Sequence, residues 1–312
     1  MTRTIGRRDF IKTGAGAGLT LAMGKALLAA SGRAPMTKPP VVGVGIGEDY
    51  GKAAGKAIAL AGGMKVFVQK GTKVALLANV QSRHPGTHTK PEVLRAVIGL
   101  CKKVGAARID CLSWQPVKQW EDTGLKAVCD AEGVGLRLFE KDEALFQSVP
   151  IPKGIALKEA RILAAYFEYD RLINMPITKD HAGNKFTGAL KNLMGLNSPV
   201  NNRTFHKPNW KTDPDDIAHL DQSIVDLNQV VKPALNVVDA TEFIVSNGPF
   251  GPGQIFTPQK VVVGTDRVAI DAYCASLWGL KPADIVQIKK ASEQGLGLMD
   301  LDKVMLKEDY YY

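Results

Sequence analysis

The stretch KVALLANV, from Lys73 to Val80, decides the predicted fold. Its unbroken apolar run has the length of one strand and is typical of a strand buried on both faces of a parallel sheet. A polar loop, His84–Thr89, follows, and Thr89 can cap a helix that begins near Pro91. Apolar residues then recur at helical spacing as far as Lys102. A buried strand, a loop and an amphipathic helix in this order are the repeating unit of an α/β fold.

The same alternation continues on both sides of this unit. The predicted strands are Val41–Ile46, Lys73–Val80, Ala107–Leu112, Val134–Leu138, Arg171–Met175, Leu235–Val238 and Lys260–Val263. The predicted helices are Tyr50–Ala61, Pro91–Lys102, Leu125–Ala131, Ala156–Tyr166, Ile217–Val230, Arg267–Leu277 and Pro282–Glu293. We therefore predict an α/β fold with a mainly parallel sheet, crossover helices and an irregular central insertion, because Thr178–Asp216 is polar and rich in Gly, Asn and Lys.

The charge of the chain is concentrated at its N-terminus. The 312 residues carry a formal net charge of +9, with 45% hydrophobic and 23% charged residues, which excludes wholesale disorder and a disulfide miniprotein. Six basic residues and one acid lie in residues 1–34, so this segment contributes +5 and the remainder +4. The remainder lacks a basic stripe interleaved with aromatic residues, and we predict no nucleic-acid partner.

The first 34 residues have the composition of an export signal. Gly6–Lys12 reads GRRDFIK and resembles a twin-arginine signal, and a short Gly/Ala-rich apolar run follows it. The alternative is an ordinary amphipathic N-terminal helix. On the first interpretation, residues 1–34 are a signal peptide that engages the twin-arginine export machinery, residues 35–312 are a single α/β domain, and the protein is periplasmic or otherwise exported. We predict no stable membrane span in the mature chain, because the run is shorter than about 20 apolar residues.

The cysteines do not have the spacing of a local metal or cluster site. Cys101, Cys111, Cys129 and Cys274 form no C-x-x-C pair, so an own iron–sulfur cluster is not expected. Buried free thiols are favoured, because Cys101 and Cys274 lie on apolar helix faces. An oxidising compartment would also permit a disulfide among Cys101, Cys111 and Cys129.

The central segment Asn174–Gly195 carries the candidate catalytic residues. Lys179 and His181 follow a predicted strand, and an ammonium beside an imidazole lowers the pKa of each group, as a general base that works near neutrality requires. Lys191 and Asn192 lie just beyond, and a helix start near Thr187 would offer free backbone N–H groups to a carboxylate or phosphate. His206 could fold back over the same site. The alternative is a basic loop that is merely solvated.

A second candidate cluster follows KVALLANV itself. Arg83, His84 and His88 lie in the loop at the carboxyl end of the predicted strand, where open parallel sheets bind ligands. They could bind the substrate anion, and His84, His88 or His206 together with an aspartate could hold a metal ion. A capped surface turn with two exposed histidines explains the same pattern. The segment Asn247–Gly253, NGPFGPG, has the composition of a lid or binding loop.

Several of these motifs together resemble domain-of-unknown-function family 362, whose bacterial and archaeal members are often joined to ferredoxin-like domains. The resemblance runs from about Gly43 to Asp300. It rests on KVALLANV with THTKPEVLRAVI and VGA, on INMPITKDH with TGALKNLMG, and on GTDRVAIDA with GLG. Where family members often read K-P-N, this chain has Leu77-Ala78-Asn79, and the cysteines of the ferredoxin-like domain are absent. A fainter similarity of layout is to lactate-racemase-type proteins.

The resemblance implies a fold and a motif set, and the residues suggest a function. We expect an exported enzyme that acts on a small anionic or carbonyl-bearing substrate, with Lys179 and His181 as the acid/base pair. Arg83, His84, His88, Lys191, Asn192 and His206 are the expected substrate-binding residues. The alternative is a non-catalytic periplasmic protein that binds a cofactor or helps to mature a redox partner.

Overall fold

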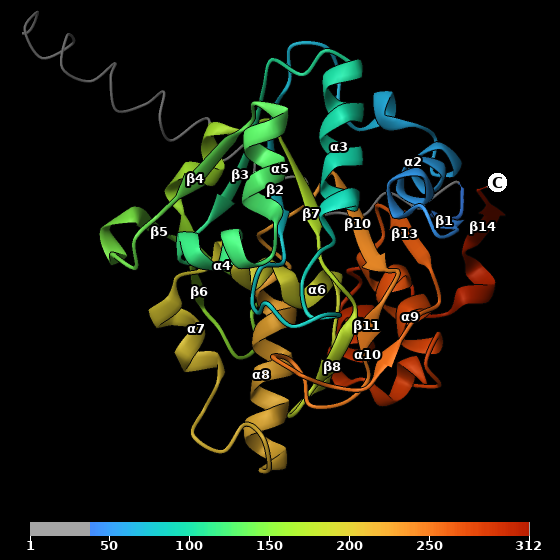
Figure 1. Ribbon diagram of the computed structural model, residues 1–312. Helices are drawn as coiled ribbons and strands as arrows, with labels where there is room; N and C mark the ends of the chain where they lie inside the picture. Colours follow the sequence, from blue (N-terminus) through green and yellow to red (C-terminus); the bar gives the residue numbers. More distant parts are fainter. Residues whose placement is uncertain (1–37, 312) are drawn as a thin grey trace, which may run out of the picture. The chain divides into compact units, whose positions relative to one another are not determined.

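An eight-stranded sheet forms the centre of the computed structural model, which describes residues 38–311 (Figure 1). The strands lie in the order β14 (Met305–Tyr310), β1 (Val41–Ile46), β13 (Lys260–Gly264), β10 (Leu235–Ala240), β7 (Arg171–Met175), β2 (Lys73–Ala78), β3 (Arg108–Ser113) and β4 (Gly135–Leu138). Only β13 runs antiparallel to its neighbours, β1 and β10, and all other neighbours in this sheet are parallel. The predicted α/β fold with a mainly parallel sheet is confirmed.

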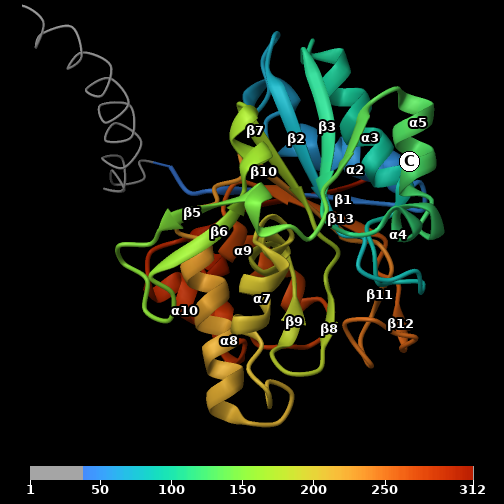
Figure 2. The same ribbon diagram turned by 90° about the vertical axis from the view of Figure 1, so that its left-hand side faces the viewer.

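Helices cover both faces of the sheet, so the apolar runs are buried on both sides (Figure 2). In β2, Val74 and Leu76 pack into one core while Ala75 and Leu77 pack into the other, as the period of two in a strand requires. The first core contains residues of α2 (Tyr50–Leu60), α3 (Pro91–Lys103) and α5 (Leu125–Glu132). The second contains residues of α8 (Pro214–Leu227), α9 (Arg267–Ser276) and α10 (Val286–Glu293).

The glycines of β1 allow helix α2 to lie directly on the sheet. A Cβ atom at Gly43 would come within 2.4 Å of the Ala57 carbonyl oxygen, and one at Gly45 within 2.0 Å of the Ala53 carbonyl oxygen. Both distances are shorter than a carbon atom can approach an oxygen. The GVGIG sequence at residues 43–47 therefore serves close packing of strand and helix in this chain.

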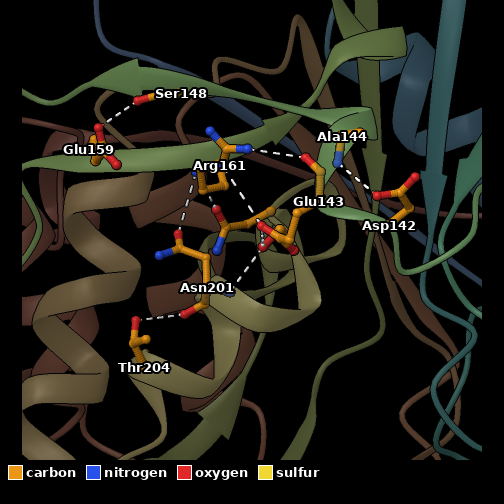
Figure 3. Close-up of polar contacts among 10 residues, drawn as sticks. Asp142, Glu143, Ala144, Ser148, Glu159, Arg161, Asn201 and Thr204 are labelled. Atoms are coloured by element: carbon orange, nitrogen blue, oxygen red, sulfur yellow. Dashed lines mark hydrogen bonds and ion pairs between the residues drawn. The ribbon is translucent and has the colours of Figure 1, made fainter.

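The predicted helix Ala156–Tyr166 is wrong. Residues Glu159–Leu163 form strand β6, which pairs with β5 (Phe146–Pro150) in an antiparallel hairpin, and a 3-10 helix follows at Ala164–Glu168. Figure 3 shows how this hairpin is held by polar contacts. The Arg161 guanidinium donates to the Glu143 carbonyl oxygen at 3.1 Å, and its backbone N–H donates to the side chains of Asn197 and Asn201. Long-range contacts thus outweigh the local helix propensity of the segment.

The Asp226 carboxylate binds the segment that connects the two strands of this hairpin. The Asp226 side chain is fully buried at the end of α8, and its Oδ2 accepts the backbone N–H groups of Ile155, Ala156 and Leu157 at 2.7–2.9 Å. These residues connect β5 to β6, and the carboxylate provides the acceptor that their buried N–H groups require.

The region between β7 and α8 consists of short elements rather than a disordered connection. It contains the hairpin β8 (Lys179–His181) and β9 (Lys185–Thr187), followed by α6 (Ala189–Asn192), a 3-10 turn and α7 (Pro199–Phe205). A further hairpin pairs β11 (Phe243–Ile244) with β12 (Ile255–Phe256), and α4 (Val117–Asp122) lies between β3 and α5.

The predicted signal peptide lies outside the described residues. Residues Pro40–Tyr312 form one compact unit. No helix in residues 38–311 is both long enough and apolar enough to span a bilayer.

We predict that Asp226→Ala lowers the free energy of unfolding by about 3 kcal/mol, because three backbone donors lose their acceptor in a buried place. Urea denaturation followed by circular dichroism measures the change. The matched control is Asp130→Ala, which removes an exposed carboxylate paired with Lys126 and should change stability by less than about 1 kcal/mol. Equal effects of the two substitutions would contradict this role of Asp226.

Candidate functional site

The candidate site lies where the parallel strands β2 and β7 end side by side. Loop 79–89 follows β2 and β8 follows β7, so the two predicted clusters meet at the carboxyl edge of the sheet. Thr89 does not cap α3 as expected, since Lys90 is the residue before the helix. Its hydroxyl donates to the Met175 carbonyl oxygen at 2.6 Å and accepts the Asn79 N–H, which ties the loop to the end of β7.

Lys179 is a fully buried cation that holds this loop. Its Nζ donates to the Thr87 carbonyl oxygen at 2.7 Å and to the side-chain oxygens of Asn79 and Gln81 at 3.3 Å each. Three oxygens therefore accept the three protons of the ammonium. Burial and the nearby Lys191 ammonium lower the pKa of Lys179 to about 7.

A chain of buried amide side chains joins Lys179 to the middle of the sheet. Asn79 donates to Asn192 at 3.0 Å, Asn192 donates to Asn174 at 2.7 Å, and Asn174 donates to Asn236 at 3.0 Å. Asn236 in turn donates to the Gly264 carbonyl oxygen in β13. We name this set the asparagine chain. Asn192, predicted to bind substrate, has its amide engaged here and fixes α6 against the sheet.

Lys191 differs from Lys179 in having no oxygen acceptor among residues 38–311. Its side chain is 8% exposed, and the contact of its Nζ is with the Met194 sulfur at 4.0 Å. Burial lowers the pKa of Lys191 to about 8, and the Asp221 carboxylate opposes this shift. Burial in turn raises the pKa of Asp221 to about 6, and Asn184 donates to it at 2.9 Å. Lys191 is thus a buried amine whose hydrogen bond goes to a sulfur atom, which is a weak acceptor.

Two imidazoles and an indole surround the same place. The ring centroids of His181 and His206 are 6.4 Å apart, and each lies about 5 Å from that of Trp210. His206 Nδ1 lies 3.0 Å from the Asn202 carbonyl oxygen, so it carries the proton and leaves Nε2 as an acceptor. His181 Nδ1 is buried without a partner. Burial and Lys191 lower the pKa of His206 to about 4 and that of His181 well below its usual range.

The expected free N–H groups at the start of the following helix are occupied by the protein. The helix begins at Ala189 rather than near Thr187, and the Asp271 carboxylate accepts the N–H groups of Ala189 and Leu190 at 2.6 and 2.9 Å. The expectation that this helix start binds a substrate anion is therefore wrong. The Asp271 carboxylate of α9 occupies the position where a substrate anion was expected.

Arg83 and His84 line a separate pocket of about 350 Å³. Gln81, Gln119 and Phe250 also line it, and the Ser82 hydroxyl donates to the Phe250 carbonyl oxygen at 2.7 Å. The predicted lid, Asn247–Gly253, is therefore in contact with the loop after β2. Gln81 connects the pocket to the buried site, because its side chain both lines the pocket and accepts from Lys179.

His88 has a hydrogen bond within its own loop. Its Nδ1 lies 2.9 Å from the Ser82 carbonyl oxygen, and burial lowers the pKa of His88 to about 4. It is a buried neutral imidazole that supports the loop. Within residues 38–311, no group of three or more His, Cys, Asp or Glu side chains is arranged to hold a metal ion.

A family model matches the part of the chain that contains these groups. The model of the domain of unknown function DUF362 matches residues 74–276, more than half of the chain. The chain belongs to the DUF362 family.

The other comparisons add little to this assignment. No curated protein matches the sequence. Among solved structures, the lactate racemase apoprotein from Thermoanaerobacterium thermosaccharolyticum matches with a TM-score of 0.41 and 15% identity. The match covers 64% of this chain and 51% of that chain, so this chain spans about half the length of the racemase.

The structure brings Lys179, His181, Lys191 and His206 together and leaves Arg83 and His84 at the neighbouring pocket. Asp221 and Trp210 were missed from the sequence. The sequence could have indicated Asp221, because this residue lies at helical spacing from Ile217 and Ile224 on the apolar face of α8. No pattern in the sequence indicates Trp210, because it reaches the site from an irregular segment.

We predict that Lys179→Met lowers the free energy of unfolding by about 2–3 kcal/mol, because one buried and two partly buried oxygens lose their donor. Thermal and urea denaturation at pH 7 measure the loss. Lys126→Met removes an exposed partner of Asp130 and should change stability by less than about 1 kcal/mol. Wild-type stability of Lys179→Met would show that the lysine does not hold the loop.

We also predict acid destabilisation that begins near pH 6.5. The pKa of His206 is lowered in the folded protein to about 4, so between pH 6.5 and 4 the unfolded chain binds a proton that the folded chain excludes. Stability therefore falls as pH falls, by up to about 1.4 kcal/mol per pH unit for one histidine. His206→Phe keeps a ring beside Trp210 and should reduce this slope.

Urea denaturation at pH 7, 6 and 5 tests this dependence on His206. His219→Gln is the matched control, since His219 lies half-buried on α8 and should change the slope less. Identical slopes for His206→Phe and the wild type would contradict the assignment.

Proposed function

We propose that this DUF362 protein is an enzyme that acts on a small anionic or carbonyl-bearing substrate at the Lys179–His206 site. The proposal rests on one observation. Lys191 is a buried amine without an oxygen acceptor, and it lies beside two neutral imidazoles. The protein itself supplies no full hydrogen-bond complement for this amine, although it does so for Lys179.

The charge balance of the site favours an anion. Lys179 and Lys191 are both buried there, whereas Asp221 is the carboxylate that acts on Lys191. Burial raises the pKa of Asp221 to about 6, which reduces its value as a counter-ion. A carboxylate or other small oxyanion beside Lys191 would accept its hydrogen bonds and stabilise its charge. Buried charges are stable in proteins when they are paired in this way.

The groups around Lys191 are suited to moving protons. The Nδ1–H group of His206 donates to the Asn202 carbonyl oxygen, so the Nε2 lone pair is available as a general base. Lys191 has a pKa of about 8, so both its charged and its neutral form exist near neutral pH. The charged form would hold an anion, and the neutral amine suits contact with a carbonyl group. Lys179 and His181 remain the proposed acid/base pair next to it.

The pocket beside Gln81 supports a route for the substrate. It is lined by Arg83 and His84, and also by Gln81, whose side-chain oxygen accepts a hydrogen bond from the Lys179 ammonium. An anionic substrate would meet the exposed Arg83 guanidinium first. Rotation of the Gln81 side chain would then bring the substrate to the buried lysines.

We propose further that the protein is exported by the twin-arginine machinery. The GRRDFIK motif supports this location, and its residues lie outside the described part of the chain. A periplasmic redox partner belongs to the alternative function, a binding or maturation protein without turnover.

We predict that Lys191→Met weakens the binding of small anions about 10- to 100-fold, the loss expected when a charge-assisted hydrogen bond is removed. Calorimetric titration of the wild type and the variant with acetate, pyruvate, oxalate and phosphate measures the affinities. Lys207→Met is the matched control, because Lys207 is an exposed lysine next to His206 and should leave affinity unchanged.

A metabolite screen by mass spectrometry with the same proteins separates the two candidate functions. Turnover by the wild type that is lost in Lys191→Met supports the enzyme. Anion binding without turnover of any metabolite favours the binding protein. Equal affinities of the wild type and Lys191→Met for every anion would remove this site assignment.

A further inference from the structure

Two of the four buried cysteines lie in direct contact. The sulfur atoms of Cys111 and Cys129 are 3.7 Å apart, and both side chains are fully buried. Cys111 lies in the middle of β3, and Cys129 lies on the buried face of α5. A disulfide bond is about 2.05 Å long, so modest rotation about the two side-chain torsions would bring the sulfurs to bonding distance.

The other two cysteines have different surroundings. Cys101 lies in the same core, but its sulfur contacts Met64 at 4.0 Å. Cys274 lies in the core on the opposite face of the sheet. Cys111 and Cys129 are thus the pair that the fold brings together, where the sequence left three cysteines as candidates.

The chain between the two cysteines carries one wall of the pocket. Residues 112–128 contain α4, and α4 supplies Gln119 and Asp122 to the pocket lining. Trp120 between them is fully buried and anchors α4 to the core. A covalent link from β3 to α5 would therefore enclose this wall in a closed loop and limit its movement.

We propose that Cys111 and Cys129 form a disulfide by thiol–disulfide exchange, and that this bond fixes the α4 wall of the pocket. During folding, before α5 packs on β3 and buries both sulfurs, the Cys129 thiolate attacks a small-molecule or enzyme disulfide and releases one thiol. The Cys111 sulfur then displaces the second thiol. Two S–H bonds of the protein are lost, one S–S bond forms, and the two electrons and two protons pass to the external disulfide, which becomes two thiols. The proposal does not depend on the proposed enzyme activity, but its source of oxidant rests on the proposed export.

Two features support the direction of attack and the source of oxidant. The hydrogen bond with Cys111 lowers the pKa of the Cys129 thiol, whereas the hydrogen bond with Cys129 and burial raise the pKa of Cys111. The sulfur of lower pKa supplies the thiolate. An exported protein would meet disulfide oxidants outside the cytoplasm.

The test is to refold the reduced full chain with a mixture of oxidised and reduced glutathione, and in parallel with reduced glutathione alone. Each product is then unfolded, alkylated with iodoacetamide and examined by intact mass and peptide mapping. We expect two alkylated cysteines after oxidative refolding, Cys101 and Cys274, and four after reductive refolding. A single linked peptide should join Cys111 to Cys129.

Variants and hydrogen exchange test the specificity and the consequence of the bond. Cys101→Ala should still form the linked peptide, whereas Cys129→Ala should leave all three remaining thiols reactive. In the oxidised wild type, amides of residues 117–122 should exchange about tenfold more slowly than in the reduced protein, since fewer open states are accessible.

Four reactive thiols after oxidative refolding, or a bond that involves Cys101, would overturn the proposal. The mass measurement on the wild type shows whether the Cys111–Cys129 bond forms even if Cys129→Ala does not fold. Unchanged exchange in a protein that contains the bond would overturn the role in the pocket wall.

Discussion

The asparagine chain is the constraint on which the rest of the site depends. Its hydrogen bonds run from Asn79 through Asn192 and Asn174 to Asn236, across the ends of β2, β7 and β10. An amide has both donors and an acceptor oxygen, so each residue can be satisfied only when its neighbours on both sides are correctly placed. A shift of α6 by a fraction of a turn would leave several buried polar groups unpaired. The short helix that carries Lys191 is therefore held in one position, although four residues of helix have little stability of their own.

The two buried lysines illustrate different solutions to the same electrostatic problem. A buried ammonium is unstable unless oxygen atoms accept its protons or its pKa falls. Lys179 has three acceptors and holds a loop, and its role in the fold explains its burial without any ligand. Lys191 has a lowered pKa and no oxygen acceptor, and packing alone does not explain why a lysine is present there. The asymmetry between them supports Lys191 as the proposed anion-binding residue, which is the role that the sequence also suggested for it.

The limits of sequence-based prediction follow from the range of the interactions. KVALLANV and the helix after it are visible in the sequence because a doubly buried strand and an amphipathic helix are local patterns. Lys179, His181, Lys191 and His206 were predicted together because they follow closely in one segment. The hairpin at Phe146–Leu163 was missed, because its backbone is held by Asp226, about seventy residues away. Asp271 took the place of an expected ligand for the same reason. Chain neighbours can be inferred from spacing, whereas partners that arrive from distant helices cannot.

Gln81 forms hydrogen bonds both with the buried Lys179 and with the α4 wall of the pocket. Its side-chain oxygen accepts from Lys179, and its backbone carbonyl accepts from Gln119 in the α4 wall. Gln81 therefore lies between α4 and the Lys179 ammonium, with one hydrogen bond to each. If Gln81 moves away, Lys179 keeps Asn79 and Thr87 as acceptors, its charged form is less stable and its pKa falls further. A ligand in the pocket that displaces Gln81 would thus lower the proton affinity of Lys179 as it arrives. The pocket and the buried Lys179 thus share Gln81 as a common contact.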